Sequence, residues 1–572
     1  KRLGHLHLNT RARAACLYLG ELPQTGRWPT KKSKVTMTSS KKRPVVLIVR
    51  DGWGHNPYPD QDFCNAVVQA DAPRDQRLLA EYPHVQIATS GEDVGLPDGV
   101  MGNSEVGHQN IGAGRIVDQE LMRITRAIRN GSFFENQTLQ AAVAHVQQSG
   151  GSLHLLGLVS DGGVHSHVDH ACALIDFCQR AGLAANRLCV HAITDGRDTS
   201  PTGGAGYVKQ LEDKLASAGI GRVASVVGRF YAMDRDFRWD RVQQAYFMLT
   251  QGAEKVMASA DEAIQHYYSH PTDESRHGDE FITPVSIAPN GVVQDEQRVR
   301  DGDAVIFFNY RGDRPREITK AFVLDNDDWS AIKNGGFDRG PQIQNLYFAT
   351  MARYEADLPT HVIFEKPAKM ENILGSYLSS LGLKQFRCAE SEKHPHVTYF
   401  FNDYREEPFD GELQQELPSP KHVSTYDQIP EMAALEVTST VLDAIASDQY
   451  DFILVNYANG DMVGHTGVLA AAIQAVETVD QCVGRLVEAV LAKGGALVVT
   501  ADHGNCEQMI DRETGRPHTA HTTYDVDLIV VDPDSQGKKL RSGGRLADIA
   551  PTVLDLLGLE KPGQMTGESL LR

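Results

Sequence analysis

The sequence predicts an α/β protein with a largely parallel sheet. From Pro44 onward, short apolar runs of strand length alternate with longer segments whose apolar residues recur at helical spacing. Clusters of Asp, Arg and His follow directly after the apolar runs. In open α/β sheets, ligands bind at the carboxyl ends of the strands. The same pattern therefore predicts an active site assembled from distant segments of the chain.

The apolar runs are expected to be buried strands. They cover residues 45–49, 153–159, 188–193, 223–227, 304–308, 452–455 and 496–499. Between the last two runs, apolar residues recur at helical spacing from Ile473 to Val490. Lys493 and Gly494 then supply a C-terminal stop, because glycine readily adopts the left-handed conformation that ends a helix.

Composition narrows the class of protein and its partners. The 572 residues are 41% hydrophobic and 23% charged, and no apolar run approaches the ~18 residues of a membrane-spanning helix. The 56 Lys and Arg against 75 Asp and Glu give a net charge of −19, which repels nucleic acid and anionic lipid. We therefore expect no nucleic acid or membrane partner. Our further expectations are a small-molecule substrate and a monomer.

The eight cysteines indicate a reducing compartment. They form no CxxC pair and lack the density of a disulfide framework. We therefore expect free thiols and a cytoplasmic protein.

Residues 1–43 differ in composition from the rest of the chain. They hold eleven Lys and Arg against a single acid, Glu21. An Arg-rich, acid-poor leader is typical of an organelle transit peptide, but a disordered extension or a start at Met37 fits equally well. We expect a basic, disordered leader here.

One group of candidate residues has the chemistry of a metal site. It consists of Asp51, Asp461, His465, Asp502, His503 and His521. Carboxylates and imidazoles without a thiolate suit Mn²⁺, Mg²⁺ or Zn²⁺, and this many ligands indicates two ions. Asp461 and His465 are four residues apart, which directs both side chains the same way on a helical turn. Taken singly, each Asp could be a turn former and each His a surface group. The set together favours metal binding.

A second group of candidate residues is cationic. It consists of Arg197, Arg229, Arg235, Arg311, Arg314 and Lys393. Guanidinium groups bind phosphate and carboxylate through two hydrogen bonds, so several at strand ends of an acidic protein predict a small, multiply charged anion as substrate. Any single Arg could instead form a surface ion pair.

Ser104 lies between these groups in sequence, within Gly102-Asn103-Ser104-Glu105. A Ser before a helix is most often an N-cap. However, a helix N-terminus also stabilises a phosphoryl group, and a nearby metal favours the Ser alkoxide. Ser104 is therefore either a helix cap or the nucleophile that accepts a phosphoryl group.

The segment 165–170 carries three histidines and one aspartate, as a further metal cluster would. It follows a predicted strand, where loops are common. We expect a flexible surface loop or a substrate contact rather than a third metal.

These motifs closely resemble those of one family, the cofactor-independent (2,3-bisphosphoglycerate-independent) phosphoglycerate mutases of the alkaline-phosphatase-like superfamily. The likeness runs from about Pro44 to the C-terminus. It rests on ordered motifs at residues 51–54, 101–108, 160–167, 195–199, 228–236, 311–314, 392–400, 459–461, 500–505 and 519–522. One departure is Arg50, where an apolar residue usually precedes the aspartate.

The resemblance implies two divalent ions, expected to be Mn²⁺ with Mg²⁺, Co²⁺ or Zn²⁺ as alternatives, and no 2,3-bisphosphoglycerate. It implies that one ion is held by Asp51, Ser104, Asp502 and His503, and the other by Asp461, His465 and His521. Ser104 is the implied phosphoryl acceptor and Asp198 the implied base. The implied glycerate-binding residues are His165, Arg197, Asp198, Arg229, Arg235, Arg311, Arg314 and Lys393.

The resemblance also implies two domains and a reaction. A phosphatase-like metal domain would comprise residues 44–117 and 358–572, with a substrate domain, residues 118–357, inserted in it. The implied reaction interconverts 3-phosphoglycerate and 2-phosphoglycerate through phosphoserine. A metal phosphatase or phosphopentomutase should lack the arginines, and the latter should use Thr as nucleophile. A non-catalytic binding protein would tolerate loss of the nucleophile or of ligands, and none is lost here.

Overall fold

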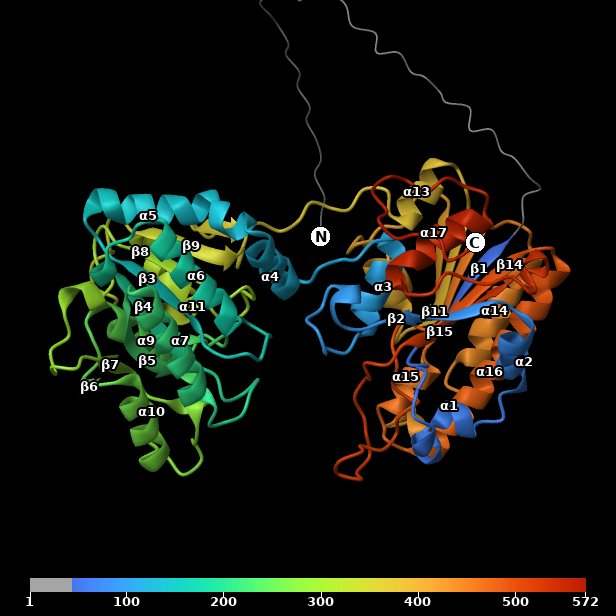
Figure 1. Cartoon of the computed structure of the whole chain (residues 1–572), viewed down its shortest axis with the longest axis horizontal. Helices are drawn as coiled ribbons and strands as arrows, with labels where there is room; N and C mark the ends of the chain where they lie inside the picture. Colours follow the sequence, from blue (N-terminus) through green and yellow to red (C-terminus); the bar gives the residue numbers. More distant parts are fainter. Residues whose placement is uncertain (1–43) are drawn as a thin grey trace, which may run out of the picture. The chain divides into compact units, whose positions relative to one another are not determined.

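The structure, a computed structural model, describes residues 44–572 (Figure 1). The basic leader expected at residues 1–43 lies outside these described residues. Within residues 44–572, none of the helices combines the length and apolarity that a bilayer crossing requires.

One sheet, which we call the outer sheet, takes strands from both ends of the described chain. Its strand order is β12-β11-β13-β1-β14-β15-β2-β16. Its strands are β1 (Val45–Arg50), β2 (His84–Ala88), β11 (Gln385–Glu390), β12 (Glu412–Leu417), β13 (Phe452–Tyr457), β14 (Ala496–Thr500), β15 (Val526–Val531) and β16 (Gly544–Arg545). The strands from β12 to β14 pair in parallel, whereas β15 is antiparallel to both neighbours.

The second sheet, which we call the inserted sheet, uses only the middle of the chain. Its strand order is β10-β9-β8-β3-β4-β5-β7-β6, and its single antiparallel pair is β5 with β7. Its strands are β3 (Leu153–Leu158), β4 (Leu188–Thr194), β5 (Arg222–Gly228), β6 (Lys255–Met257), β7 (Val285–Ile287), β8 (Ala304–Phe307), β9 (Tyr347–Ala352) and β10 (His361–Phe364).

Helices accompany each sheet. With the outer sheet lie α1 (Ala66–Gln69), α2 (Pro73–Glu81), α3 (Ser104–Ala113), α13 (Leu374–Ser380), α14 (Ala434–Ala446), α15 (Asn459–Gly464), α16 (Leu469–Ala492) and α17 (Ile549–Leu556). With the inserted sheet lie α4 (Glu120–Asn130), α5 (Gln137–Ser149), α6 (Val168–Arg180), α7 (Gly204–Ala218), α8 (Arg229–Ala232), α9 (Trp239–Thr250), α10 (Ala260–Ser269), α11 (Arg316–Val323) and α12 (Asn326–Ser330). We call each sheet with its helices the outer unit and the inserted unit.

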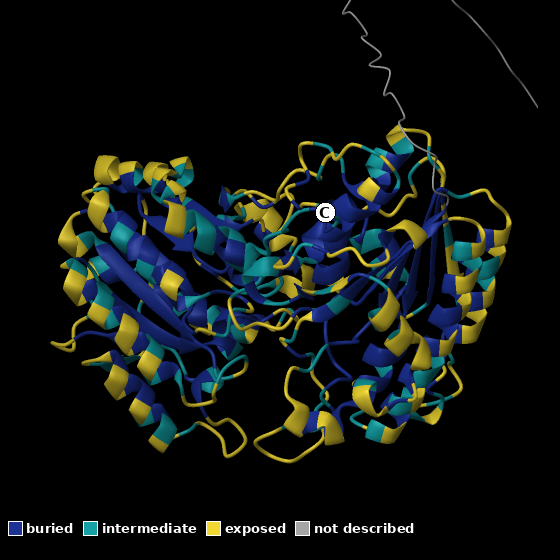
Figure 2. Ribbon diagram, turned by 45° about the vertical axis from the view of Figure 1, so that its right-hand side comes forward, coloured by how far each residue is buried: buried dark blue, intermediate teal, exposed yellow. Residues whose placement is uncertain are grey.

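Both faces of the inserted sheet are buried. Along β3, Leu153 and Leu155 belong to one apolar cluster, whereas Leu156 and Leu158 belong to another. Successive side chains of a strand point to opposite faces, so the sheet separates two cores. Figure 2 shows the strands as buried and the outward helix faces as exposed. Such burial explains why these strands are apolar runs without alternation.

The predicted strands and helix are confirmed. Each of the seven apolar runs forms a strand of one sheet or the other. The predicted helix is α16, which ends at Ala492 before Gly494, whose φ of 68° is left-handed.

The boundary expected at residue 358 does not match the sheets. Strand β10 pairs in parallel with β9, with His361 opposite Ala349, so it belongs to the inserted sheet. The first element after it that lies with the outer sheet is α13. The short β10 offers too little periodicity to show which sheet it joins, because pairing is a tertiary choice.

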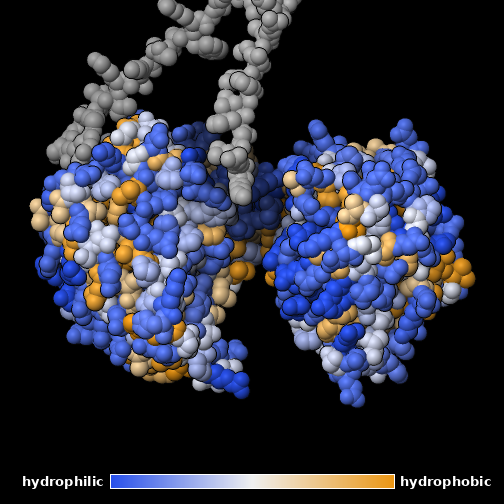
Figure 3. Space-filling model, turned by 180° about the vertical axis from the view of Figure 1, so that it is seen from behind, coloured by the Kyte–Doolittle hydropathy of each residue, from blue (hydrophilic) through white to orange (hydrophobic). Residues whose placement is uncertain are grey.

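The surface carries scattered apolar side chains. On the face drawn in Figure 3, hydrophobic residues are dispersed among hydrophilic ones. The most exposed large hydrophobic side chains among the described residues are Phe63 and Val292, at 64% and 61%. They lie on different units, and single exposed apolar residues are normal for a globular surface.

Candidate functional site

Ser104 is the first residue of helix α3, and Asn103 is the helix cap. The Asn103 side chain accepts a hydrogen bond from the backbone N–H of Val106 at 2.9 Å. The interpretation of Ser104 as an N-cap is therefore wrong, because the preceding residue already caps the helix. The Ser104 hydroxyl is free to serve another purpose at the positive end of the helix dipole.

The Ser104 hydroxyl is buried among charged side chains of the outer unit. Its Oγ accepts a hydrogen bond from Lys393 Nζ at 2.7 Å and lies 3.0 Å from His503 Nε2. It also donates to Asp51 Oδ1 at 3.2 Å. The residue is 5% exposed. Side chains from three distant segments thus converge on the Ser104 hydroxyl.

Lys393 lies among the charged side chains around Ser104. Its charge alone had led to the prediction that it belongs with the arginines. Its ammonium donates to Asp51 Oδ1 at 2.8 Å and to Asp461 Oδ2 at 2.6 Å, besides Ser104. Burial acts to lower the pKa of Lys393, but the carboxylates of Asp461, Asp51 and Asp502 raise it above its ordinary value. Lys393 is therefore a fixed positive charge at the serine.

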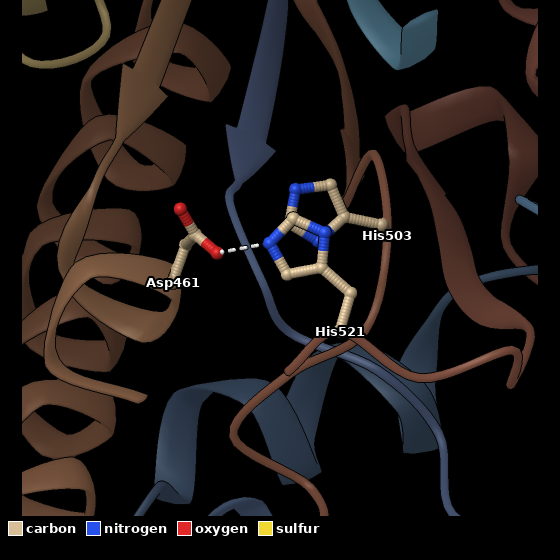
Figure 4. Close-up of side chains that lie close together, drawn as sticks. All are labelled: Asp461, His503 and His521. Carbon is tan, nitrogen blue, oxygen red and sulfur yellow. Dashed lines mark ion pairs between the residues drawn. The ribbon is translucent and has the colours of Figure 1, made fainter. Parts of the chain in front are cut away.

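A first cluster of metal-ligand type surrounds Asp461 (Figure 4). One carboxylate oxygen, Oδ1, lies 3.1 Å from His465 Nε2 and 3.0 Å from His521 Nε2. Ligand atoms of Asp461, His503 and His521 all lie within 4.8 Å of one another. Helix α15 carries Asp461 and ends beside His465, so the predicted four-residue spacing does direct both side chains to one place.

A second cluster joins Asp51 and Asp502 to a histidine that the sequence analysis missed. The ligand atoms of Asp51, His108 and Asp502 lie within 4.8 Å of one another, and all three residues are buried. His108 Nδ1 is 3.2 Å from Asp502 Oδ2. His108 is four residues after Ser104 on α3, the same spacing that identified Asp461 with His465, so a search along the helix face would have found it.

The negative charge of the second cluster favours binding of a cation. Asp502 is fully buried, and neither carboxylate oxygen has a well-aligned hydrogen-bond partner among the described residues. Burial acts to raise the pKa of Asp502, but the rings of His503 and His108, with Lys393, hold it below its ordinary range. Burial and the Asp502 carboxylate raise the pKa of Asp51. Crowded buried carboxylates of this kind are stable when a cation balances them.

Arg50, which departs from the family pattern, is paired with a carboxylate outside this site. Its Nη1 lies 2.5 Å from Asp75 Oδ1, and its guanidinium stacks 4.4 Å from the Trp53 ring. The side chain is buried. Its charge is therefore balanced by a carboxylate of helix α2.

In the inserted unit, Arg229 is the centre of the predicted anion-binding group. It is 2% exposed, and its Nη1 donates to Asp195 Oδ1 and Asp198 Oδ2, both at 2.6 Å. Asp195 also accepts hydrogen bonds from the backbone N–H groups of Arg197 and Asp198. The loop after β4 is therefore fixed around Asp195, a residue that the sequence analysis had not assigned to the site.

Asp313, also missed, pairs with two further arginines of this group and lies near His165. It lies 3.0 Å from Arg311 Nε, 3.2 Å from Arg235 Nη1 and 3.7 Å from His165 Nδ1. A pocket of about 490 Å³ in the inserted unit is lined by four of the predicted arginines, Arg197, Arg229, Arg235 and Arg314. Of these four arginines, Arg314 donates to the backbone oxygen of Met233, and the other three pair with carboxylates that an entering anion would have to displace.

Two histidines of segment 165–170 have structural roles. The His167 side chain caps helix α6 by accepting from Asp169 N–H at 3.2 Å. His170 is 1% exposed, and its Nε2 lies 2.9 Å from Thr125 Oγ1. His165 is 3% exposed, so the expectation of a flexible surface loop is wrong for it. Burial, then Arg229, lowers the pKa of His165 to about 4, so its ring is neutral near pH 7.

We expect the inserted unit to lose stability as the pH falls from about 6.5 towards 4. Burial lowers the pKa of His170 to about 3, whereas the unfolded chain binds a proton at the ordinary value of 6.5. Protons therefore favour the unfolded chain in this window, by at most about 1.4 kcal/mol per pH unit for one ring. Urea unfolding at pH 7 and 5 should show a shallower pH dependence in His170→Gln than in wild type. His145→Gln, at a less buried ring on α5, is the control, and equal slopes in both variants would contradict the prediction.

The fold and this geometry together define a class of protein. A buried serine at a helix start, between clusters of Asp and His at the carboxyl ends of a mostly parallel sheet, is the arrangement of the alkaline-phosphatase-like enzymes. The profile of the family described as "Sulfatase" matches residues 391–559. The profile described as "BPG-independent PGAM N-terminus" matches residues 124–356, which lie within the inserted unit.

The chain belongs to the family of 2,3-bisphosphoglycerate-independent phosphoglycerate mutases. The protein of that name from Rhodopirellula baltica is 65% identical over 94% of this chain and 98% of its own length. That from Syntrophotalea carbinolica is 51% identical over 94% and 99%. A crystal structure of Leishmania mexicana phosphoglycerate mutase at low cobalt concentration is 32% identical, covers 93% of this chain and 98% of its own, and has a TM-score of 0.55. These comparisons confirm the resemblance.

Proposed function

We propose that this chain interconverts 3-phosphoglycerate and 2-phosphoglycerate through a phosphoserine at Ser104, without 2,3-bisphosphoglycerate. The observation that carries the proposal is the position of the Ser104 hydroxyl. It lies at the start of α3, is not used as a cap, and is held by Lys393 among buried carboxylates and imidazoles. A group placed in this way is suited to attack phosphorus rather than to support the helix.

The reaction proceeds in two phosphoryl transfers. Ser104 Oγ attacks phosphorus, and the bond from phosphorus to glycerate O3 breaks. The proton that leaves Ser104 Oγ is transferred to O3, which gives glycerate. The glycerate then turns, its 2-hydroxyl gives a proton to Asp198, and O2 attacks the phosphoserine. The bond from phosphorus to Ser104 Oγ breaks, the proton held by Asp198 is passed back to Oγ, and 2-phosphoglycerate is released. Lys393 stays protonated and stabilises negative charge on the phosphoryl oxygens.

Two divalent ions fit the residues of the outer unit. We propose Asp51, Ser104, Asp502 and His503 as ligands of one, and Asp461, His465 and His521 of the other. His503 lies near both clusters, and its Nε2 is 3.4 Å from Asp51 Oδ1, which supports its assignment to the first ion. The Asp502 oxygens, which lack a well-aligned hydrogen-bond partner among the described residues, support this proposal. So do the rings of His465 and His521, whose Nδ1 atoms lie 2.7 and 2.9 Å from backbone oxygens, which leaves Nε2 for a cation. When bound, such ions, expected to be Mn²⁺, lower the pKa of the serine hydroxyl and balance phosphoryl charge.

The glycerate is held by the inserted unit in this proposal. Arg197, Arg229, Arg235, Arg311 and Arg314 bind its carboxylate and phosphate, and Asp198 is the base for its hydroxyl. His165 is neutral, so it would position the phosphoryl group by hydrogen bonding and add no charge. We further propose that the metal domain comprises residues 44–117 and the chain after β10, with the substrate domain between them. A cytoplasmic, monomeric enzyme stays our expectation.

Replacing Arg235 by Ala is expected to increase phosphate release per 2-phosphoglycerate formed by several-fold. Glycerate that is held less tightly leaves before it accepts the phosphoryl group, and water then attacks phosphoserine. Free phosphate and 2-phosphoglycerate are measured from the same 3-phosphoglycerate reaction. Arg300→Ala is the matched control, because Arg300 also pairs with an Asp in the inserted unit, Asp295 at 2.9 Å, outside the proposed site. Equal partitioning in both variants would argue against a role of Arg235 in holding glycerate.

The proposed function is tested by following 2-phosphoglycerate formed from 3-phosphoglycerate with no added bisphosphoglycerate. We expect turnover, and its loss in the presence of a chelator. A requirement for added 2,3-bisphosphoglycerate would refute the proposal.

A further inference from the structure

Glu507 is a fully buried carboxylate that none of the proposed steps uses. It follows His503 by four residues in the segment after β14 and is 0% exposed. Its pKa is raised by burial, and hydrogen bonds from Thr522, Asn505 and Gly54 oppose that effect. A buried carboxyl group is costly unless its oxygens are satisfied, so its contacts show what holds it there.

Each contact of the Glu507 carboxylate reaches a different segment that carries a proposed metal ligand. Oε2 accepts from the backbone N–H of Gly54 at 3.1 Å, three residues after Asp51. The same oxygen accepts from Asn505 N–H at 2.7 Å, two residues after His503. Oε1 accepts from the hydroxyl of Thr522, the neighbour of His521.

The backbone approaches the carboxylate closely at two glycines, Gly54 and Gly504. A Cβ added to Gly54 would lie 2.3 to 2.5 Å from the carboxyl atoms of Glu507. A Cβ added to Gly504 would lie 2.2 Å from Oε1. Gly504 also forms an isolated antiparallel β-bridge with Thr522, whose backbone N–H donates to the Gly504 carbonyl oxygen at 3.0 Å. Three chain segments therefore meet at one carboxylate, two of them through glycines and the third through the Thr522 hydroxyl.

We propose that Glu507 is a positioning residue for the metal centre, which fixes the segments of Asp51, His503 and His521 relative to one another through its two oxygens. The inference rests on the proposed metal-binding role of those three residues. Two of them, His503 and His521, stack with ring centroids 3.9 Å apart, so a shift of either segment displaces both rings. Partners that orient metal ligands typically change metal affinity by about 10- to 100-fold when removed.

Glu507→Gln and Glu507→Asp separate positioning from charge. The Gln amide has the same length, its oxygen can accept from Gly54 and Asn505, and its NH₂ can donate to the Thr522 hydroxyl, which then acts as acceptor. Asp keeps the charge but is one methylene shorter, so it cannot reach all three donors at once. If Glu507 acts by positioning, Glu507→Gln should keep the metal affinity and Glu507→Asp should lose it. If only its charge matters, Glu507→Asp should keep the affinity and Glu507→Gln should lose it.

The measurement is Mn²⁺ binding to metal-free, folded enzyme, followed by the electron paramagnetic resonance signal of free Mn²⁺. We expect Glu507→Asp to raise the Kd about 10- to 100-fold and Glu507→Gln to stay within about 3-fold of wild type. We expect kcat of Glu507→Asp to recover at saturating Mn²⁺. Should Glu507→Asp fail to fold, Thr522→Val removes one of the three contacts and should raise the Kd several-fold, with Thr522→Ser unchanged.

Asp548→Asn is the matched control for loss of a buried carboxylate. Asp548 is 3% exposed and accepts from the N–H groups of Arg545 and Glu568, neither of which adjoins a proposed ligand. The Asp548→Asn substitution should lower the melting temperature of the metal-free protein without altering the Kd for Mn²⁺. The inference would be overturned if the Kd for Mn²⁺ were unchanged in both Glu507→Asp and Thr522→Val. It would also be overturned if Glu507→Gln lost as much Mn²⁺ affinity as Glu507→Asp, or more. Failure of wild type to bind Mn²⁺ would instead refute the metal site itself.

Discussion

Replacing Ser104 by Ala is expected to reduce mutase activity by about 10³-fold or more while leaving the fold in place. The substitution removes the oxygen that would accept the phosphoryl group, and losses of this size are usual when a nucleophile is deleted. The hydroxyl does not cap α3, so little stability should be lost with it. Substrate binding should persist, because the arginines belong to the inserted unit.

Asn103→Ala is the matched control for this prediction, since it removes the cap of the same helix and leaves Ser104 in place. It should cost about 0.5 to 2 kcal/mol of stability. Initial rates and thermal unfolding of both variants, measured side by side, separate the two roles. If Ser104→Ala keeps substantial activity and loses mainly stability, the serine is a structural residue.

Exhaustive chelation is expected to abolish turnover, and Mn²⁺ is expected to restore it. Six of the proposed ligands are carboxylates or imidazoles that the outer unit brings together around Ser104, with Lys393 as the cation already among them. Without divalent ions the serine would keep its ordinary hydroxyl pKa and lack charge compensation for the phosphoryl group. Metal content measured alongside activity checks the result, and full activity at negligible metal content would contradict it.

The Mn²⁺ concentration that restores half of the activity should rise as the pH falls below about 7. The hydrogen bond to Asp461 raises the pKa of His465. Burial acts to lower the pKa of His521, but the Asp461 carboxylate raises it by more, so the pKa is above its ordinary value. Protons therefore compete with the metal for both rings at a higher pH than for a free histidine, and metal binding must release them. Mn²⁺ titrations of activity at pH 6 and 8 measure this competition, and equal midpoints would show that these rings are not ligands.

The sequence predicted what depends on local pattern. Asp51 follows an apolar run that becomes β1, and Asp461 with His465 shares a helical turn, so periodicity alone places these side chains. The convergence of six candidate ligands followed from the rule that strand carboxyl ends meet at one edge of a parallel sheet. The family resemblance added the roles of individual residues.

What the sequence did not predict depends on tertiary contacts. Glu507 and Asp313 are ordinary acids in sequence, and only the segments they join give them a role. Lys393 was grouped with the arginines by charge, yet its segment after β11 directs it to Ser104. Strand β10 is four residues long, and its partner β9 is chosen by packing rather than by its own pattern.

The most direct test of a phosphoserine mechanism is mass spectrometry of enzyme quenched during turnover of 3-phosphoglycerate, without added bisphosphoglycerate. Peptides covering the whole chain are compared for added phosphate. We predict phosphate on Ser104, appearing with substrate and discharging when substrate is removed. Phosphate on another residue, or sustained turnover with none on Ser104, would contradict the mechanism.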